Sequence, residues 1–491
     1  MIKCGAPRPK STFARFFRGK SAVGFCVLVL LIEIWIFLFK SKDSDLNLYQ
    51  VYGHASRVSS LSGLYNHPDT TVEYPPLAIS LALMTDAIAQ HLPDCSRLGR
   101  FFSPYNRAPD IANFKLVFRL EMALVTFLTF LLVIRYLKTW MPLEASSERF
   151  ERLLTFVLSL LILNEFIFDK LDILVGALLL LFLVLMSSRI RYIWSFAILA
   201  FGIAFKFVPI IAVPLGVLGS LPSNLLANGG RIAVWMRVLP IAIRRGLLVA
   251  ALTVILFVPF LLIAGPKCLA FLTYHKNRGI QCESSYAGLL GILKYLGGLK
   301  VTGVPSYGSC DLQSSLSPLL ASLSPGIAGT LLVGVTLLLF VKIRSVVSNQ
   351  SDRSMLSTSL GRLCHADFSL HLILLLLVFI FSNKVFSTQY VLWLVPLAPL
   401  VPFEGRSRRL AQAGLLFLFY LTTLIARCSL PELAGKPQFG SQGLYMAGPA
   451  PFAVVLIVGR TIVLAGLIGW ITFSIVRWRQ KGHALPPLKS V

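Results

Sequence analysis

The sequence predicts an all-α polytopic membrane protein, in which residues 21–477 form one bundle of about twelve transmembrane helices. Composition is the first indication, because 56% of the 491 residues are hydrophobic and only 14% are charged, a balance foreign to soluble domains. Continuous apolar runs such as residues 173–186 are the second, since a β-barrel would show short alternating strands. Basic residues between these runs are the third, because this bias orients membrane helices.

The N-terminal part sets the orientation of the predicted bundle. Residues 1–20 carry lysines and arginines without an acid, so we expect them in the cytoplasm. No small-residue cleavage site follows the apolar run 21–39, which favours a retained first helix over a signal peptide. Residues 41–113 then form the first extracytoplasmic loop. The direction of the next helix requires that the apolar part of this loop, residues 75–92, does not cross.

The remaining apolar runs alternate in direction, and each inward helix ends on lysines or arginines. Residues 193–221 are too long for one span and are interrupted by Lys206 and by prolines, so two short helices should meet near Lys206. We expect the arginines of residues 231–245 in a cytoplasmic loop. A large extracytoplasmic loop is expected at 265–324, and a cytoplasmic tail at 478–491. The other expected spans are residues 114–136, 153–168, 171–186, 246–264, 325–340, 369–381, 390–402, 410–425 and 452–475.

Charge and cysteine content exclude two classes of function. A net charge of +25 would suggest a nucleic-acid partner in a soluble protein, but here the basic residues flank apolar runs, so we expect no nucleic acid. The cysteines are scattered without a CxxC pair, so no metal cluster is indicated. In the predicted topology Cys282 and Cys310 lie outside the cytoplasm, where they could pair, and Cys4 lies inside.

Ionisable residues of mixed type gather on the predicted extracytoplasmic face, where acids stand beside lysines, tyrosines and a histidine. Lys170, Lys206 and Arg460 each lie within or at the end of an apolar run. An ionisable group at membrane depth costs at least ~2.5 kcal/mol, so it usually faces a cavity and has a function. The plain alternative is that extracytoplasmic loops are simply polar.

A series of short segments on this face resembles, in its order, the GT-C class of polytopic glycosyltransferases. The closest likeness is to the bacterial family 87 mannosyltransferase-like proteins, and the last segment also resembles the eukaryotic mannosyltransferase that adds the first mannose of the GPI anchor. The segments are Asp45-Leu-Asn-Leu-Tyr49, Tyr74-Pro-Pro-Leu77, Lys170-Leu-Asp172, Phe205-Lys206-Phe-Val-Pro209, Tyr274-His275-Lys-Asn-Arg278-Gly-Ile-Gln281-Cys-Glu283-Ser284 and Asn383-Lys384-Val-Phe-Ser387-Thr-Gln389-Tyr390-Val-Leu-Trp393.

The resemblance implies a GT-C-like bundle with extracytoplasmic active-site loops. It implies transfer of a hexose, with mannose as the favoured sugar, from a polyprenyl-phosphate carrier to a lipid or glycan acceptor. The transfer is expected to invert the anomeric configuration. Such a reaction needs a base for the acceptor hydroxyl and cations for the departing phosphate. The implied base is a first-loop carboxylate, Asp45, with Asp43 as the second candidate. The alternative for Asp45 is that it caps the helix that follows.

The implied substrate contacts extend along the chain. His275, Arg278 and Lys384 are expected at the phosphate, because arginine offers forked donors and lysine a point charge. Their alternative role is interfacial snorkelling. Further substrate-binding residues are expected at Tyr49, Tyr74, Lys170, Asp172, Lys206, Gln281, Glu283, Gln389, Tyr390 and Arg460. No metal and no cofactor is expected, because a monophosphate leaving group does not demand a metal.

The expected partners are the lipid-linked sugar, its acceptor and membrane lipids. We expect a multi-pass protein of a bacterial inner membrane with its site facing the periplasm, or of the endoplasmic reticulum with a lumenal site if the source is eukaryotic. An insert at 93–109 and the loop 301–324 depart from the family pattern and leave the acceptor open. Two other functions remain: a transporter or lipid flippase, which should show internal repeats that are not seen here, and a non-catalytic scaffold subunit.

Overall fold

The computed structural model describes residues 21–40, 44–66, 72–93, 109–141, 146–186, 192–221, 231–306, 309–348, 356–440 and 443–478. The N-terminal segment 1–20, Asp43, Cys4, most of the insert 93–109 and most of the tail 478–491 lie outside the described residues.

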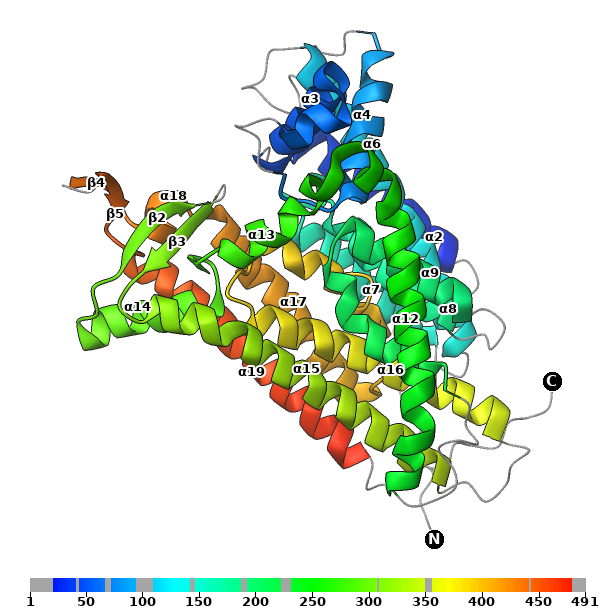
Figure 1. Ribbon diagram of the computed structural model, residues 1–491. Helices are drawn as coiled ribbons and strands as arrows, with labels where there is room; N and C mark the ends of the chain where they lie inside the picture. Colours follow the sequence, from blue (N-terminus) through cyan, green and yellow to red (C-terminus); the bar gives the residue numbers. More distant parts are fainter. Residues whose placement is uncertain are drawn as a thin grey trace.

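Long helices make up most of the described chain and pack side by side as a bundle (Figure 1). Stretches long and apolar enough to cross a membrane lie in α2, α6, α15, α17 and α19, and in Met236–Asn277, which runs from α12 into α13 (Ala270–Asn277); six such stretches occur among the described residues. The predicted total of about twelve crossings stays a prediction. The helices of the bundle are α2 (Ser21–Phe39), α6 (Pro109–Trp140), α7 (Ser146–Ile162), α8 (Asp172–Met186), α9 (Tyr192–Phe205), α12 (Arg231–Ala264), α15 (Ser317–Ser348), α16 (Leu356–Ser382), α17 (Gly405–Arg427) and α19 (Pro451–Trp478).

The outside of the bundle is apolar, as a lipid-facing surface requires. Leu262, Val455 and Ile462 are all largely exposed on helices of the candidate spans. In water such a surface would be a site of aggregation, whereas in a bilayer it is solvated by lipid tails. The described chain therefore has the surface of a membrane-embedded protein.

The predicted break near Lys206 is confirmed. Helix α9 ends at Phe205, and a short 3-10 turn, η1 (Val208–Ala212), leads into α10 (Val213–Gly219). Proline at position 209 lacks the N–H that would continue α9 and packs against Gly202, where an added Cβ would lie 3.1 Å from the proline ring. The break leaves Lys206 in non-helical backbone at the end of an apolar helix.

The predicted helix at residues 390–402 is wrong. This segment consists of 3-10 turns, η3 (Thr388–Leu394) and η4 (Ala398–Leu400), followed by extended backbone, and it is buried throughout. Prolines at 396, 399 and 402 remove backbone donors at every third residue, which disfavours a continuous α-helix. Irregular backbone at membrane depth is tolerated where protein surrounds it, and the burial of this segment satisfies that condition.

Three further expectations need correction. The arginines of residues 231–245 lie in the first turns of α12 and not in a loop. Helix α7 stops at Ile162, and turns occupy residues 163–169, where the predicted span continued to 168. The predicted first loop is largely helical, because it contains α3 (Ser44–Asn66), kinked at Ser60, and α4 (Pro76–Gln90). These two helices project together at one end of the molecule (Figure 1).

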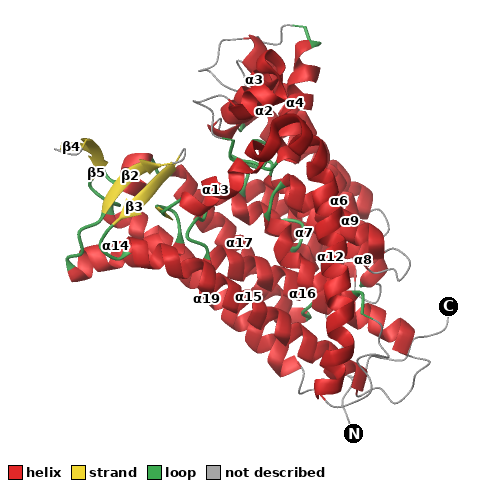
Figure 2. Ribbon diagram, viewed as in Figure 1, coloured by secondary structure: helices red, strands yellow, loops and turns green. Residues whose placement is uncertain are grey.

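A small antiparallel sheet was not predicted and stands beside α14 (Ser285–Gly297), apart from the bundle (Figure 2). Its strand order is β1-β3-β2-β5-β4, with Ile280 opposite Leu312 in the β1–β3 pair and Gly303 opposite Met446 in the β2–β5 pair. The sheet has its own apolar core against α14, α18 (Leu430–Ala434) and α19. The strands are β1 (Ile280–Gln281), β2 (Thr302–Ser306), β3 (Ser309–Gln313), β4 (Pro437–Gly440) and β5 (Gly443–Met446).

Candidate functional site

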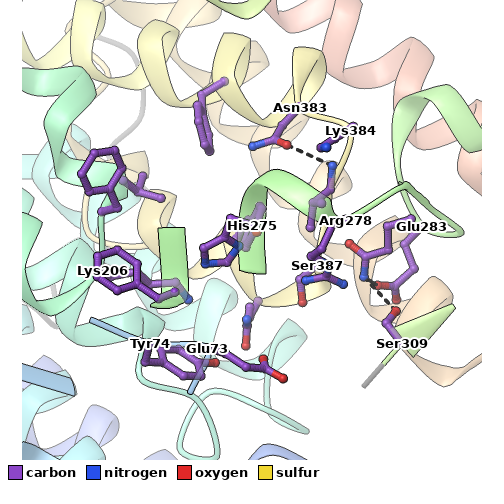
Figure 3. Close-up of a pocket in the computed structure, with 18 of the residues that line it drawn as sticks. Glu73, Tyr74, Lys206, His275, Arg278, Glu283, Ser309, Asn383, Lys384 and Ser387 are labelled. Atoms are coloured by element: carbon purple, nitrogen blue, oxygen red, sulfur yellow. Dashed lines mark hydrogen bonds between the residues drawn. The ribbon is translucent and has the colours of Figure 1, made fainter. Parts of the chain in front are cut away.

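A cavity of about 950 Å³ lies where the helical bundle meets the sheet and the α3–α4 pair. Its wall is built by the residues before α4, the break at Lys206, the segment from α13 (Ala270–Asn277) into β1, and the segment 383–390, which follows α16 and enters η3. In Figure 3, Lys206, Tyr74 and Glu73 lie on one side, Arg278, Glu283 and Lys384 on the other, and His275 between them. Segments far apart in the sequence therefore meet at one site.

The lining has two characters. Charged groups come from the loops and helix ends, whereas the apolar lining comes from α13, α15, α16 and η1, including Phe271, Leu332, Phe379 and Ile211. A cavity of this size with both kinds of wall suits an amphiphilic ligand that has a polar head and an apolar tail.

The segment Asp169-Lys170-Leu-Asp172 ties three distant elements together at the cavity. The guanidinium Nε of Arg119 lies 3.1 Å from the Asp169 carboxylate, and both side chains are buried. Lys170 Nζ lies 2.6 Å from the Asp45 carboxylate on α3. Asp172 opens α8 as a first-turn acid, which a helix N-terminus favours, and accepts hydrogen bonds from other segments.

Asp172 holds the lysine of the helix break. Lys206 Nζ donates to the two carboxylate oxygens of Asp172 at 2.7 and 2.8 Å, and the indole Nε1 of Trp393 donates to the same carboxylate at 2.6 Å. The ammonium also lies 5.5 Å from the ring centroid of Tyr74 and 5.8 Å from that of Tyr390. The charge of Lys206 is thus compensated by a buried carboxylate and surrounded by aromatic faces.

Arg278 differs from these lysines. Its side chain is only 9% exposed and lines the cavity, its Nε has no hydrogen-bond partner, and no salt bridge joins it to a carboxylate of the described chain. Its guanidinium lies 5.7 Å from the ring centroid of Tyr274. Lys384 is half-buried nearby and donates to the Lys276 carbonyl at 2.9 Å, and burial lowers the pKa of Lys384. A buried guanidinium without a carboxylate partner is suited to bind an anion.

The sheet side of the wall is held by amide and hydroxyl contacts. Gln281 Nε2 donates to the Glu283 carboxylate at 3.0 Å and to the Ser309 hydroxyl at 3.2 Å. Its backbone N–H donates to the Lys384 carbonyl at 3.1 Å, which joins β1 to the segment 383–390. Ser309 was not among the predicted site residues, because no local sequence pattern links it to Gln281.

Arg460 lies behind this wall and not in the cavity lining. It is fully buried, donates to the backbone carbonyl of Glu283, and places its guanidinium 3.7 Å from the ring centroid of Phe386. Arg460 was expected among the substrate-binding residues, but its contacts here are a main-chain oxygen and an aromatic face. Arg460 can therefore act on a ligand only by positioning Glu283.

Glu73 is a carboxylate that the sequence prediction of the site missed. It lines the cavity, its carboxylate accepts from the Tyr274 hydroxyl, and its backbone N–H donates to the Tyr52 hydroxyl at 3.2 Å. Burial raises the pKa of Glu73, and the Tyr274 hydrogen bond and the charge of Arg278 oppose that rise. The available signal was its position directly before Tyr74-Pro-Pro-Leu77.

Most predicted site residues converge on the cavity. Tyr49 lies behind it and shares a hydroxyl hydrogen bond of 3.1 Å with Tyr74, Asp172 lies behind Lys206, and Asp43 is outside the described residues. The other lining residues that the prediction missed include Asn383, Ser387 and Thr388. The predicted residues in the lining are Asp45, Tyr74, Lys170, Lys206, His275, Arg278, Gln281, Glu283, Lys384, Gln389 and Tyr390.

Within the described ranges no group of three or more His, Cys, Asp or Glu side chains could hold a metal ion. Cys282 and Cys310 are buried neighbouring free thiols next to the cavity wall. Their burial means that thiol labelling of the folded protein would not report on the side of the membrane they face.

A scan against protein-family models gives no match, and a search of curated proteins also gives none. The likeness to the GT-C class therefore depends on the short segments quoted above. Those segments are the ones that meet at the cavity.

Proposed function

We propose that this chain is a membrane glycosyltransferase of the GT-C type. It transfers a hexose, with mannose as the favoured sugar, from a polyprenyl-phosphate carrier to a lipid or glycan acceptor. The observation that carries the proposal is Arg278, a buried guanidinium in the cavity wall without a carboxylate partner among the described residues. The amphiphilic lining supports it, because the donor combines a charged head with an apolar chain.

Charge compensation assigns roles to the cations. Lys170 and Lys206 are each neutralised by a carboxylate, so they add little net positive charge to the cavity. Arg278 and Lys384 supply the positive field where phosphate would leave. Fixed cations that meet developing negative charge in a site shielded from water are the largest usual contribution to such catalysis.

Asp45 is the proposed general base. Its carboxylate lines the cavity from the first turn of α3, whereas the cations come from the α13–β1 connection and the segment 383–390. Inversion requires the acceptor and the leaving group on opposite faces of the sugar, as in inverting glycosidases. The base removes the proton of the acceptor hydroxyl as the hydroxyl oxygen attacks the anomeric carbon, and the bond from that carbon to the lipid phosphate breaks. The ion pair with Lys170 holds the carboxylate in place.

We place the protein in a bacterial inner membrane with the cavity facing the periplasm, or in the endoplasmic reticulum with a lumenal cavity. The basis is the sequence bias of basic residues, since Arg406 and Arg409 lie within the first five residues of α17, at the end away from the cavity.

The test is binding of radiolabelled polyprenyl-phosphate mannose by the purified full-length protein in detergent or nanodiscs. Arg278→Gln should weaken binding at least ~10-fold, the factor that corresponds to loss of one charge-assisted hydrogen bond. Lys300→Gln, which neutralises an exposed cation outside the cavity, is the matched control. Unchanged donor binding by Arg278→Gln would refute the phosphate assignment. Passage of intact labelled donor across a vesicle membrane without bond cleavage would support a flippase instead.

A further inference from the structure

Two cysteines stand directly behind the cavity wall on facing strands. Gln281 and Ser309 line the cavity and hydrogen-bond to each other, and the next residue of each segment is a cysteine. Side chains alternate across a strand, so Cys282 and Cys310 point away from the cavity into the apolar core of the sheet. Both are buried there, 2% and 0% exposed.

The backbone register brings the two cysteines opposite each other. The β1–β3 pair matches Ile280 with Leu312 and Gln281 with Asp311, so the next step of the ladder matches Cys282 with Cys310. The N–H of Cys282 donates to the carbonyl of Cys310 at 2.9 Å. Hydrogen-bonded opposite residues of an antiparallel pair have Cα atoms about 5.5 Å apart, which is within the range that a disulfide spans.

The wall has a weak point that such a bond would correct. Strand β1 is only two residues long, and it carries the cavity side chain Gln281 and leads directly to Glu283. A pairing this short holds few backbone hydrogen bonds. On its other side the backbone of Glu283 is held by Arg460. A covalent link to β3 would fix the spacing between Gln281 and Ser309.

We propose that Cys282 and Cys310 form a disulfide in the mature protein that locks the sheet side of the cavity wall. The proposal depends on the extracytoplasmic placement of the proposed function, because thiols stay reduced in the cytoplasm. The thiolate of one cysteine attacks the disulfide of a thiol oxidoreductase and forms a mixed disulfide. The thiolate of the second cysteine then attacks the mixed disulfide and releases the oxidoreductase. Two thiols lose two protons and two electrons, and the oxidoreductase disulfide is reduced to two thiols.

The first test is chemical and does not need enzymatic activity. The full-length protein, purified from membranes without reductant, is denatured in N-ethylmaleimide and digested, and the peptides are analysed by mass spectrometry. A peptide pair joined through positions 282 and 310 should dominate. Cys282→Ser should leave Cys310 alkylated, whereas Cys268→Ser and Cys428→Ser should leave the joined pair intact. If both cysteines of the wild type are alkylated, even after equilibration with oxidised glutathione and a disulfide isomerase, the disulfide is excluded.

The second test asks whether the bond supports the cavity. Reduction of the wild type should weaken binding of labelled polyprenyl-phosphate mannose several-fold, and a Cys282→Ser/Cys310→Ser double variant should bind equally with and without reductant. Equal sensitivity of the double variant would place the effect elsewhere in the chain. A joined peptide in a protein that binds no donor refutes the proposed function alone, and free thiols in a protein that binds donor refute the disulfide alone.

Discussion

Asp45→Asn is the sharpest test of the proposed chemistry, because it removes the base and keeps the size of the side chain. The variant should bind lipid-linked donor but transfer sugar at least ~100-fold more slowly, the low end of what a positioned base contributes. This factor corresponds to about 2.7 kcal/mol of transition-state stabilisation. Asp45 is the second residue of α3, in its first turn, and its carboxylate pairs with Lys170.

Loss of Asp45 also affects stability, because it removes the carboxylate that pairs with the buried Lys170. Lys170 is 9% exposed and Asp45 24% exposed, so the pair is only partly buried. The stability cost should therefore lie below the ~3–5 kcal/mol found for broken buried pairs, at about 1–3 kcal/mol. A double variant, Asp45→Asn/Lys170→Gln, replaces the ion pair by a neutral pair and should recover most of this stability.

Catalysis and stability then separate in one set of proteins. Thermal unfolding is measured for the single and double variants, and transfer is measured from labelled donor to an extracted membrane-lipid acceptor. If Asp45 is the base, the double variant is stable and still at least ~100-fold slow. If Asp45 serves only to neutralise Lys170, the double variant regains wild-type transfer. That recovery would refute Asp45 as the base and move the assignment to Glu73 or Asp43.

Three other predictions follow from the structure. Lys206→Met should destabilise the protein by about 3–5 kcal/mol in thermal unfolding, because it leaves Asp172 charged and buried. The double variant Lys206→Met/Asp172→Asn should recover most of this stability. An equal loss of stability in the double variant would contradict a compensating ion pair. Because burial raises the folded-state pKa of Glu73, wild-type stability should fall as pH rises from the usual glutamate value through the raised one, and Glu73→Gln should remove that fall; an unchanged pH profile would show that another group causes it. In vesicles of known orientation, Lys300→Cys should react with an impermeant maleimide from the extracytoplasmic side and Arg406→Cys from the cytoplasmic side, and the reverse pattern would overturn the topology.

The sequence predicted the break at Lys206 and the gathering of polar segments because both depend on local features. A charge followed by proline interrupts an apolar run wherever it occurs. Alternation of basic loops places the polar segments on one membrane face without any knowledge of contacts. Lining residues from these segments meet at the cavity.

Other features depend on contacts that a linear pattern does not contain. The apolar run at residues 390–402 predicts a helix, yet its regularly spaced prolines favour irregular backbone. Such backbone is tolerated here because the surrounding helices cover it. The sheet joins residues 280–313 with residues 437–446, and its strands are too short to give a periodic signal. In the same way, the sequence shows that Asp169, Lys170 and Asp172 are neighbours but not that each pairs with a different element.

These pairings explain how a cavity with many charges can still orient one ligand. Lys170 and Lys206 are matched by Asp45 and Asp172, so their fields largely cancel beyond a few ångströms. Arg278 has no such match within the described residues, and its field extends into the cavity. In the proposed reaction this difference would draw the anionic head group to the Arg278 side and leave the Asp45 side for the neutral acceptor hydroxyl. If the anion bound Lys206 instead, the ion pair between Lys206 and Asp172 would have to break first, at a cost in free energy. Binding at Arg278 carries no such cost, because no carboxylate of the described chain pairs with it.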